Sequence, residues 1–295
     1  MTSIDTPRPV PRLDATRIVE GLARDHEVFL ELLGLAAAGS VGAAFVRWPD
    51  GREGVLTRAG DGSAEAGSHL RATAEVLAFA RSRGVPTPRY DLVARVGDSH
   101  AVVQERLPGE PPSRVDGPLV DQMVAAAEEW TKLLADRVDI EPASLYLTES
   151  GPGFCLHETL ASYDNRTRRL LGRIREIGRL GPNALAGEDL VHLDYHCGNV
   201  LVDGSGRLTG IIDWDGWTRG DRWFSLEVLA FDLAVKCDDL QLRRRLDALI
   251  TGAVPDDQLR AYRASLSLRL VDWSIRHHGP EAVDFWLGVA AERLD

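Results

Sequence analysis

The spacing of apolar residues predicts helices over most of the C-terminal half of the chain. Apolar side chains recur every three or four residues, the period of a helix with one buried face, across residues 119–134, 160–180, 225–251, 256–277 and 280–293. Residues 64–83 are rich in helix formers and end at a Gly and Pro stop signal, residues 84–88. Short apolar runs predict buried strands instead, at residues 190–191, 200–202 and 208–212.

Polar side chains gather around these short strands. A turn sequence at residues 203–206 separates the last two runs and predicts a hairpin. His192 and Asp194 precede this hairpin, Asn199 opens it, and Asp213 ends its second strand. Asp194 lies where a hydroxyl group could give up its proton, and Asn199 and Asp213 offer the hard oxygen ligands that Mg²⁺ prefers. The segment therefore predicts a phosphoryl-transfer site.

This stretch resembles the catalytic loop and metal-binding segment of the aminoglycoside phosphotransferase and choline kinase branch of the protein-kinase-like fold. The usual pattern there is His-Gly-Asp-x-x-x-x-Asn followed by Ile-Asp-Trp, and Leu193 replaces the usual Gly here. The resemblance implies Asp194 as catalytic base, Asn199 and Asp213 as Mg²⁺ ligands, and His192 as a residue that shapes the loop. It also implies ATP or GTP as the phosphoryl donor.

The resemblance extends from about residue 38 to residue 235 and implies an α+β fold of two lobes. We expect a small N-terminal β-sheet lobe at residues 1–105, which binds the nucleotide, and a larger, mainly helical lobe at residues 106–295. A turn of small residues would cover the phosphates, with Gly39, Ser40, Val41 and Gly42. The hinge between the lobes would bind the purine edge through main-chain groups of Gln104, Glu105 and Leu107.

The first lobe departs from the family in lacking lysine. In the family, a Lys on the third strand contacts the phosphates and pairs with a Glu on the following helix. By spacing, the Lys position falls near Thr57 with Arg58 beside it, and the Glu position falls near Thr73 with Glu75 two residues on. Arg58 and Glu75 are either a substitute pair, since Arg binds phosphate well, or a solvated surface pair.

The net charge of the chain favours one chemical class of acceptor molecule. The 295 residues include 45 acids and 34 Lys or Arg, a net charge of −11, which repels nucleic acid and anionic membranes and favours cationic small molecules. Together with a kinase-like site, the acidic net charge predicts phosphorylation of a hydroxyl of a cationic antibiotic. The antibiotic would be an aminoglycoside or a basic peptide of the viomycin and capreomycin type, and its phosphorylation would confer resistance to it. Acceptor contacts are expected at Asp194, Trp214, Asp215, Trp217 and Asp221, although the two tryptophans could equally be core residues. More distant acids, some of which should face the acceptor, are Glu158, Asp164, Asp272, Glu281 and Asp284.

Location and assembly follow from simpler features. The N-terminus lacks the pattern of a signal peptide, and the longest weakly polar run, residues 33–46, is too short and Gly-rich to span a bilayer. Three widely spaced cysteines argue against a disulfide framework. We expect a cytoplasmic monomer or homodimer with no nucleic-acid or membrane partner.

Three alternatives remain open at this point. One is a metabolic kinase of the choline or homoserine type. Another is a catalytically silent, kinase-shaped binding protein, which the missing lysine suggests. The third is a metallohydrolase, because His192, Asp194, His196 and Cys197 offer imidazole, carboxylate and thiolate donors; it leaves Asn199 and Asp213 unexplained.

Overall fold

A computed structural model of the 295-residue chain describes residues 12–36 and 42–294. The chain divides into two compact units, which we describe separately. An N-terminal unit runs to residue 113 and takes in residues 198–216; a C-terminal unit comprises residues 114–197 and 217–294. A lobe boundary between residues 105 and 106 stays a prediction.

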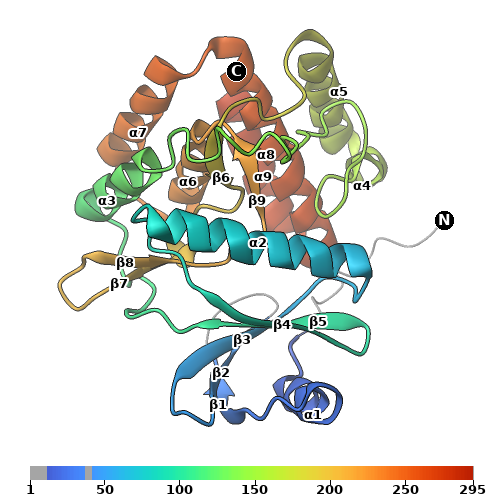
Figure 1. The fold of residues 1–295 in the computed structure, drawn as a ribbon. Helices are drawn as coiled ribbons and strands as arrows, with labels where there is room; N and C mark the ends of the chain where they lie inside the picture. Colours follow the sequence, from blue (N-terminus) through green and yellow to red (C-terminus); the bar gives the residue numbers. More distant parts are fainter. Residues whose placement is uncertain (1–11, 37–41, 295) are drawn as a thin grey trace. The chain divides into compact units, whose positions relative to one another are not determined.

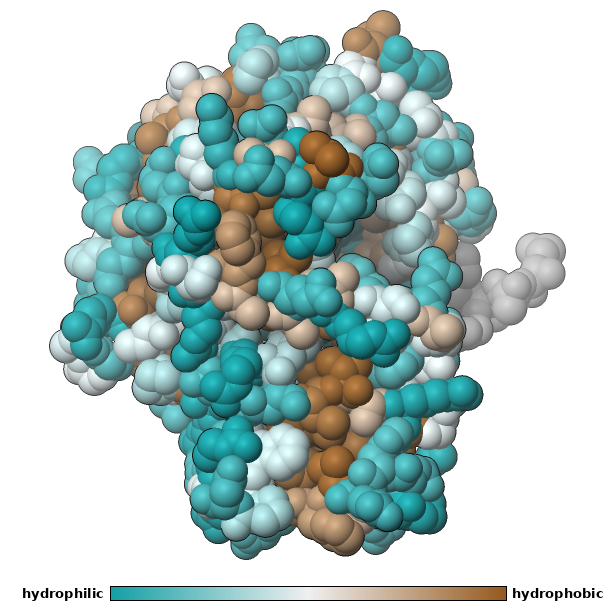
Figure 2. Space-filling view, in the orientation of Figure 1, coloured by the Kyte–Doolittle hydropathy of each residue, from teal (hydrophilic) through white to brown (hydrophobic). Residues whose placement is uncertain are grey.

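The N-terminal unit is built on an antiparallel five-stranded sheet with the order β1-β2-β3-β5-β4 (Figure 1). Its strands are β1 (Glu31–Leu35), β2 (Ala44–Arg47), β3 (Glu53–Ala59), β4 (Tyr90–Val96) and β5 (Ser99–Glu105). One face packs on α1 (Ala15–His26) through residues such as Leu22 and Leu56. The other face packs on α2 (Ala64–Ser82), where Leu70 meets Val102. In Figure 2, apolar residues gather in a band over the region of this sheet.

The predicted hairpin is present in the same unit. Strands β7 (Val200–Val202) and β8 (Leu208–Ile211) pair antiparallel. The Asp203 carboxylate fixes the turn by accepting from the backbone N–H groups of Ser205 at 2.9 Å and Arg207 at 3.1 Å. The hairpin thereby delivers Asn199 and Asp213 to its open end.

The C-terminal unit is mainly helical. Its seven helices within the described residues are α3 (Gly117–Glu128), α4 (His157–Tyr163), α5 (Asn165–Leu180), α6 (Trp223–Lys236), α7 (Leu240–Ala253), α8 (Asp256–His277) and α9 (Pro280–Leu294). A two-stranded sheet joins β6 (Asp189–His192) to β9 (Trp217–Gly220). Two lobes, one sheet-based and one helical, confirm the predicted α+β class. Among the residues placed by the structure, no helix is long and apolar enough to cross a membrane.

Two predicted helices are each broken in two. Residues 225–251 form α6 and α7, because Asp239 caps a new helix by accepting from the N–H groups of Gln241 and Leu242. Residues 160–180 fall in α4 and α5, where Asp164 and Thr167 form a capping box. Apolar periodicity continues through both breaks, so in the sequence the breaks are marked by the capping residues Asp164 and Asp239.

Candidate active site

The catalytic-loop residues predicted from the sequence follow directly from β6. His192 ends this strand and is fully buried. Its backbone N–H donates to Ser225 Oγ at 3.0 Å, and its Nδ1 accepts from the backbone N–H of Asp194 at 3.1 Å. The imidazole therefore fixes the chain at the point where Asp194 begins.

Two further side chains from the helices hold this loop. Arg269 on α8 donates from Nη1 to the Leu193 carbonyl at 2.9 Å. Asp232 on α6 accepts from the Cys197 backbone N–H at 3.0 Å. Sequence reasoning missed both contacts, because they join positions 76 and 35 residues apart.

The Asp194 carboxylate is held ionised. Burial opposes ionisation of Asp194, but nearby positive groups outweigh it. His196 Nε2 lies 3.4 Å from Asp194 Oδ2. This contact, together with the charges of Arg269 and His192, lowers the pKa of Asp194 to about 2. Its side chain is still 49% exposed, so a substrate hydroxyl can reach it. The same contact with Asp194 outweighs burial and raises the pKa of His196.

Asn199 and Asp213 meet at the open end of the hairpin in the N-terminal unit. The Ile212 N–H donates to the Asn199 carbonyl at 2.9 Å, which ties the two segments together. Asn199 is buried, and Asp213 adopts a left-handed backbone with φ of 64°, a strained conformation for a residue other than Gly. An amide oxygen and a carboxylate held in this way fit Mg²⁺, which needs few protein ligands.

The residues predicted to contact the acceptor after the metal segment have partners within the chain, and the two tryptophans among them are buried. Trp214 is fully buried and its indole N–H donates to the Ile211 carbonyl at 2.8 Å, and Trp217 is buried in β9. Asp221 accepts from Tyr262 Oη at 2.9 Å, from the Gln258 amide at 3.0 Å and from the Trp223 N–H at 3.0 Å. Asp215 accepts from Tyr90 Oη at 3.3 Å in the N-terminal unit.

Of the predicted nucleotide-binding residues, Gly39, Ser40 and Val41 lie outside the described residues. Gly42 has a φ of 87°, which only glycine adopts readily. The Glu105 N–H donates to the Arg89 carbonyl at 2.8 Å and its carboxylate pairs with Arg81, so these groups are engaged within the unit. Gln104 lies in β5 between β3 and β4. Leu107 packs against Gly210, where an added Cβ would lie 2.8 Å from it.

Comparison with known proteins decides the family. Residues 36–265 match the phosphotransferase enzyme family over more than half of the chain. This chain belongs to that phosphotransferase family. It is therefore a phosphotransferase that acts on a hydroxyl acceptor, as the sequence predicted. No curated protein sequence matches it closely enough to report.

Solved structures share the phosphotransferase fold at low identity. Aminoglycoside-3'-phosphotransferase of type VIII is 24% identical, with a TM-score of 0.56 over 81% of this chain and 93% of that one. Aminoglycoside phosphotransferase APH(4)-Ia is 18% identical, with a TM-score of 0.63 over 95% and 98%. APH(3'')-Id from Streptomyces rimosus, in complex with ADP and streptomycin, is 17% identical, with a TM-score of 0.54 over 87% and 99%.

The sequence leaves Arg58 and Glu75 of this phosphotransferase as either a substitute for the missing Lys and its Glu partner or a solvated surface pair. The structure does not bring these two residues together. Arg58 lies opposite Ala101, on the sheet face that packs on α1. Glu75 belongs to α2, which covers the other face, the one that carries Thr57 and Val102. The substitute pair is absent because β-strand side chains alternate between faces.

The distant acids of this phosphotransferase are largely engaged by other groups. Arg166 Nη2 lies 2.8 Å from both Asp164 and Asp284. Asp272 pairs with Arg276 at 2.9 Å, and Glu158 accepts from Ser150 Oγ at 2.7 Å. Of the five acids, Glu281 is exposed and has no ion pair among the residues that are placed. These contacts give little support to an acidic acceptor wall in the C-terminal unit.

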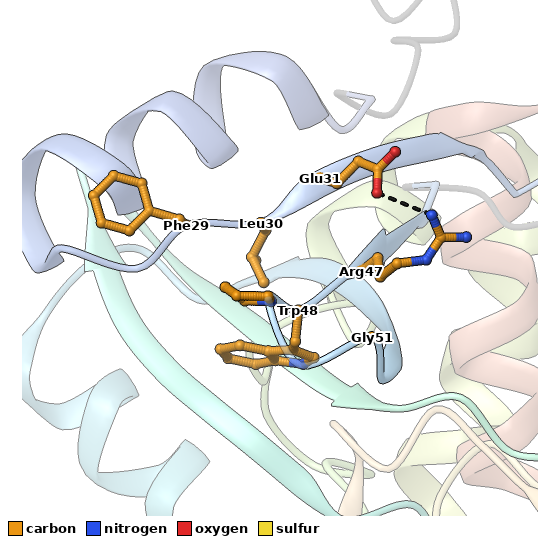
Figure 3. Close-up of a pocket in the computed structure, with 7 residues that line it drawn as sticks. Phe29, Leu30, Glu31, Arg47, Trp48 and Gly51 are labelled. Carbon is orange, nitrogen blue, oxygen red and sulfur yellow. Dashed lines mark hydrogen bonds and ion pairs between the residues drawn. The ribbon is translucent and has the colours of Figure 1, made fainter.

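A shallow cavity of about 430 Å³ in the N-terminal unit contains none of the predicted site residues (Figure 3). Leu30 points toward Trp48 in it, and Glu31 pairs with Arg47 at 2.9 Å. Across residues 12–36 and 42–294, no group of three or more His, Cys, Asp or Glu side chains could hold a metal ion. Burial also raises the pKa of the Cys197 thiol, which disfavours the thiolate that a metallohydrolase would use.

Proposed function

We propose that this phosphotransferase moves the γ-phosphoryl group of ATP or GTP to a hydroxyl of a small cationic antibiotic and thereby confers resistance. The observation that carries the proposal is the catalytic loop, in which His192, Ser225 and Arg269 hold the backbone around an ionised Asp194. Support for the antibiotic comes from the matched structures: one holds ADP and hygromycin B, another ADP and streptomycin.

Each site residue has a part in this reaction. Asp194 accepts a hydrogen bond from the acceptor hydroxyl and aims its oxygen at the phosphorus; at a pKa of about 2, it is ionised throughout the working pH range. Asp194 takes the proton of the acceptor hydroxyl late in the reaction, as expected of a loose transition state. Asn199 and Asp213 would hold Mg²⁺, which neutralises charge on the phosphate oxygens when bound. The reaction uses cytoplasmic nucleotide, so we propose a cytoplasmic enzyme, acting as a monomer or homodimer.

The test is nucleoside-diphosphate release with Mg-ATP and Mg-GTP across aminoglycosides, basic cyclic peptide antibiotics, choline and homoserine. The variant Asp194→Asn should lose most turnover, a loss of roughly 10³-fold or more, while keeping its fold and nucleotide affinity. Asp203→Asn, which changes a carboxylate of the hairpin turn, is the matched control and should retain turnover. Equal turnover in Asp194→Asn and the wild type would remove Asp194 from the chemistry.

A second candidate is a kinase-shaped binding protein without turnover. The position of Arg58 favours it, because no lysine lies in the described N-terminal unit and Arg58 is on the face away from α2. Binding of Mg-ATP or Mg-GTP with no acceptor-dependent release across the whole panel would support this candidate over the kinase. Release with choline or homoserine alone would instead identify a metabolic kinase.

A further inference from the structure

An aromatic cluster joins Phe154, in the segment before α4, to Trp273 and His277 on α8. Phe154 and Trp273 make an edge-to-face contact with ring centroids 4.4 Å apart, and His277 lies against Trp273 at 3.9 Å. Phe154 is 38% exposed. Neither Phe154 nor Trp273 takes part in the site built above.

Ionic contacts beneath the cluster hold it in place. Arg276 stacks over the Phe154 ring at 5.2 Å and donates to the Gly153 carbonyl at 2.6 Å. The fully buried Asp272 receives Arg276 at 2.9 and 3.1 Å and accepts from the Leu156 N–H at 2.8 Å. Residues 153–156 are thus tied to α8, and the exposed phenyl ring is rigidly presented. A preorganised aromatic surface of this kind is typical of a binding wall.

The same helix connects this wall to Asp194. Arg269 reaches the Leu193 carbonyl, one residue before Asp194. Trp273 follows Arg269 by four residues, about 6 Å along the helix axis and on the same face. A ligand whose hydroxyl meets Asp194 can therefore extend along α8 onto Trp273 and Phe154.

We propose that this wall binds the acceptor, and that the ring next to the reacting hydroxyl stacks on Phe154 and Trp273 and carries no ammonium group. The proposal rests on the proposed function. A hydroxylated sugar or cyclitol ring has an apolar C–H face that suits an aromatic surface. Arg269 and Arg276 flank the wall, and the Asp272 carboxylate beneath it is already satisfied by Arg276 and the Leu156 N–H. Ammonium groups of a cationic acceptor therefore lie away from α8.

The experiment compares two exposed phenylalanines of the C-terminal unit. Phe154→Ala should raise KM for hygromycin B or streptomycin by about tenfold with kcat changed less than about threefold. Phe154→Tyr should restore the wild-type KM, since it keeps the ring. Phe285→Ala is the control, because Phe285 on α9 is 43% exposed and lies against Trp286 instead; its KM should not change.

Direct titration of hygromycin B and of streptomycin into each variant separates this proposal from the proposed function. If the wild type releases no nucleoside diphosphate but binds either antibiotic, and Phe154→Ala alone weakens that binding about tenfold, the wall stands and the kinase proposal fails. If the wild type turns over and Phe154→Ala matches Phe285→Ala, the wall is refuted and the kinase stands. Preference for a sugar-free basic cyclic peptide, or no binding of either antibiotic, also overturns the wall.

Discussion

Replacing Glu227 by Gln should destabilise the helical unit, because Glu227 is the fully buried centre of an ion network. Its Oε1 accepts from Arg263 Nε on α8 at 3.0 Å and from Arg293 Nη1 on α9 at 3.1 Å. Arg293 in turn pairs with Asp247 on α7 at 2.7 Å. One carboxylate on α6 therefore connects three other helices, and the change to Gln removes its charge while keeping its volume.

The loss can be estimated from these contacts. Removing one partner of a buried ion pair costs about 3–5 kcal/mol when the other charge is left alone. Arg293 would keep Asp247 and the Ala230 carbonyl at 3.0 Å, and the Arg263 side chain is 21% exposed. In addition, Glu227 Oε2 is buried without a hydrogen bond, and burial raises the pKa of Glu227. Both effects reduce the cost, so we expect a loss of about 2 kcal/mol.

Urea unfolding followed by circular dichroism measures this loss. With a slope of roughly 2 kcal/mol per molar, the midpoint should fall by about 1 M. Glu128→Gln is the control, because Glu128 pairs with Arg222 at 2.6 Å but is 49% exposed, and exposed pairs contribute less than about 1 kcal/mol. Equal midpoints for the two variants would refute the network's importance. A stabilised Glu227→Gln would show that the cost of burying the charge exceeds its attraction to the arginines.

Two further predictions concern the thiols and Gly109. All three cysteines are buried, and burial raises the pKa of Cys155 to about 11. A disulfide reagent at pH 8 should therefore react with fewer than one thiol per native protein and with three after unfolding. Fast reaction of the native protein would contradict this prediction. Gly109→Ala should lower the free energy of unfolding by about 2 kcal/mol, since φ is 102° and a Cβ would lie 2.6 Å from the Val202 carbonyl oxygen. Gly204→Ala, where nothing lies within 4 Å, should leave the melting temperature unchanged.

The geometry of the segment from His192 to Asp213 could be predicted from the sequence because it is local. His192 acts on a backbone N–H two residues away, and Asn199 and Asp213 are brought together by a hairpin whose turn sequence is explicit. Short-range hydrogen bonds of this kind depend on spacing alone. The range predicted for α8, residues 256–277, also matches the structure, because helix periodicity is a local property of the sequence.

The Arg58 hypothesis failed for a different reason. Its neighbour Thr57 lies on the sheet face that packs on α2, and a shift of one residue along β3 moves a side chain to the opposite face. Spacing from a family pattern located the strand correctly but could not fix its register. Trp214 and Trp217 show the same limit, since burial depends on neighbours that a local pattern does not name.

The aromatic wall depends on contacts that no sequence window contains. Phe154 and Trp273 are 119 positions apart, and what presents them is the pairing of Asp272 with Arg276 and with the Leu156 N–H. The sequence places Asp272 among the acids of which some should face a cationic acceptor; its burial makes it a support for the aromatic surface instead. Net acidity can draw a cationic molecule toward the protein from a distance, whereas the contacts along α8 decide which part of that molecule lies beside Asp194. The overall charge and the local wall therefore constrain different parts of one acceptor, and a polycation with one ammonium-poor ring satisfies both.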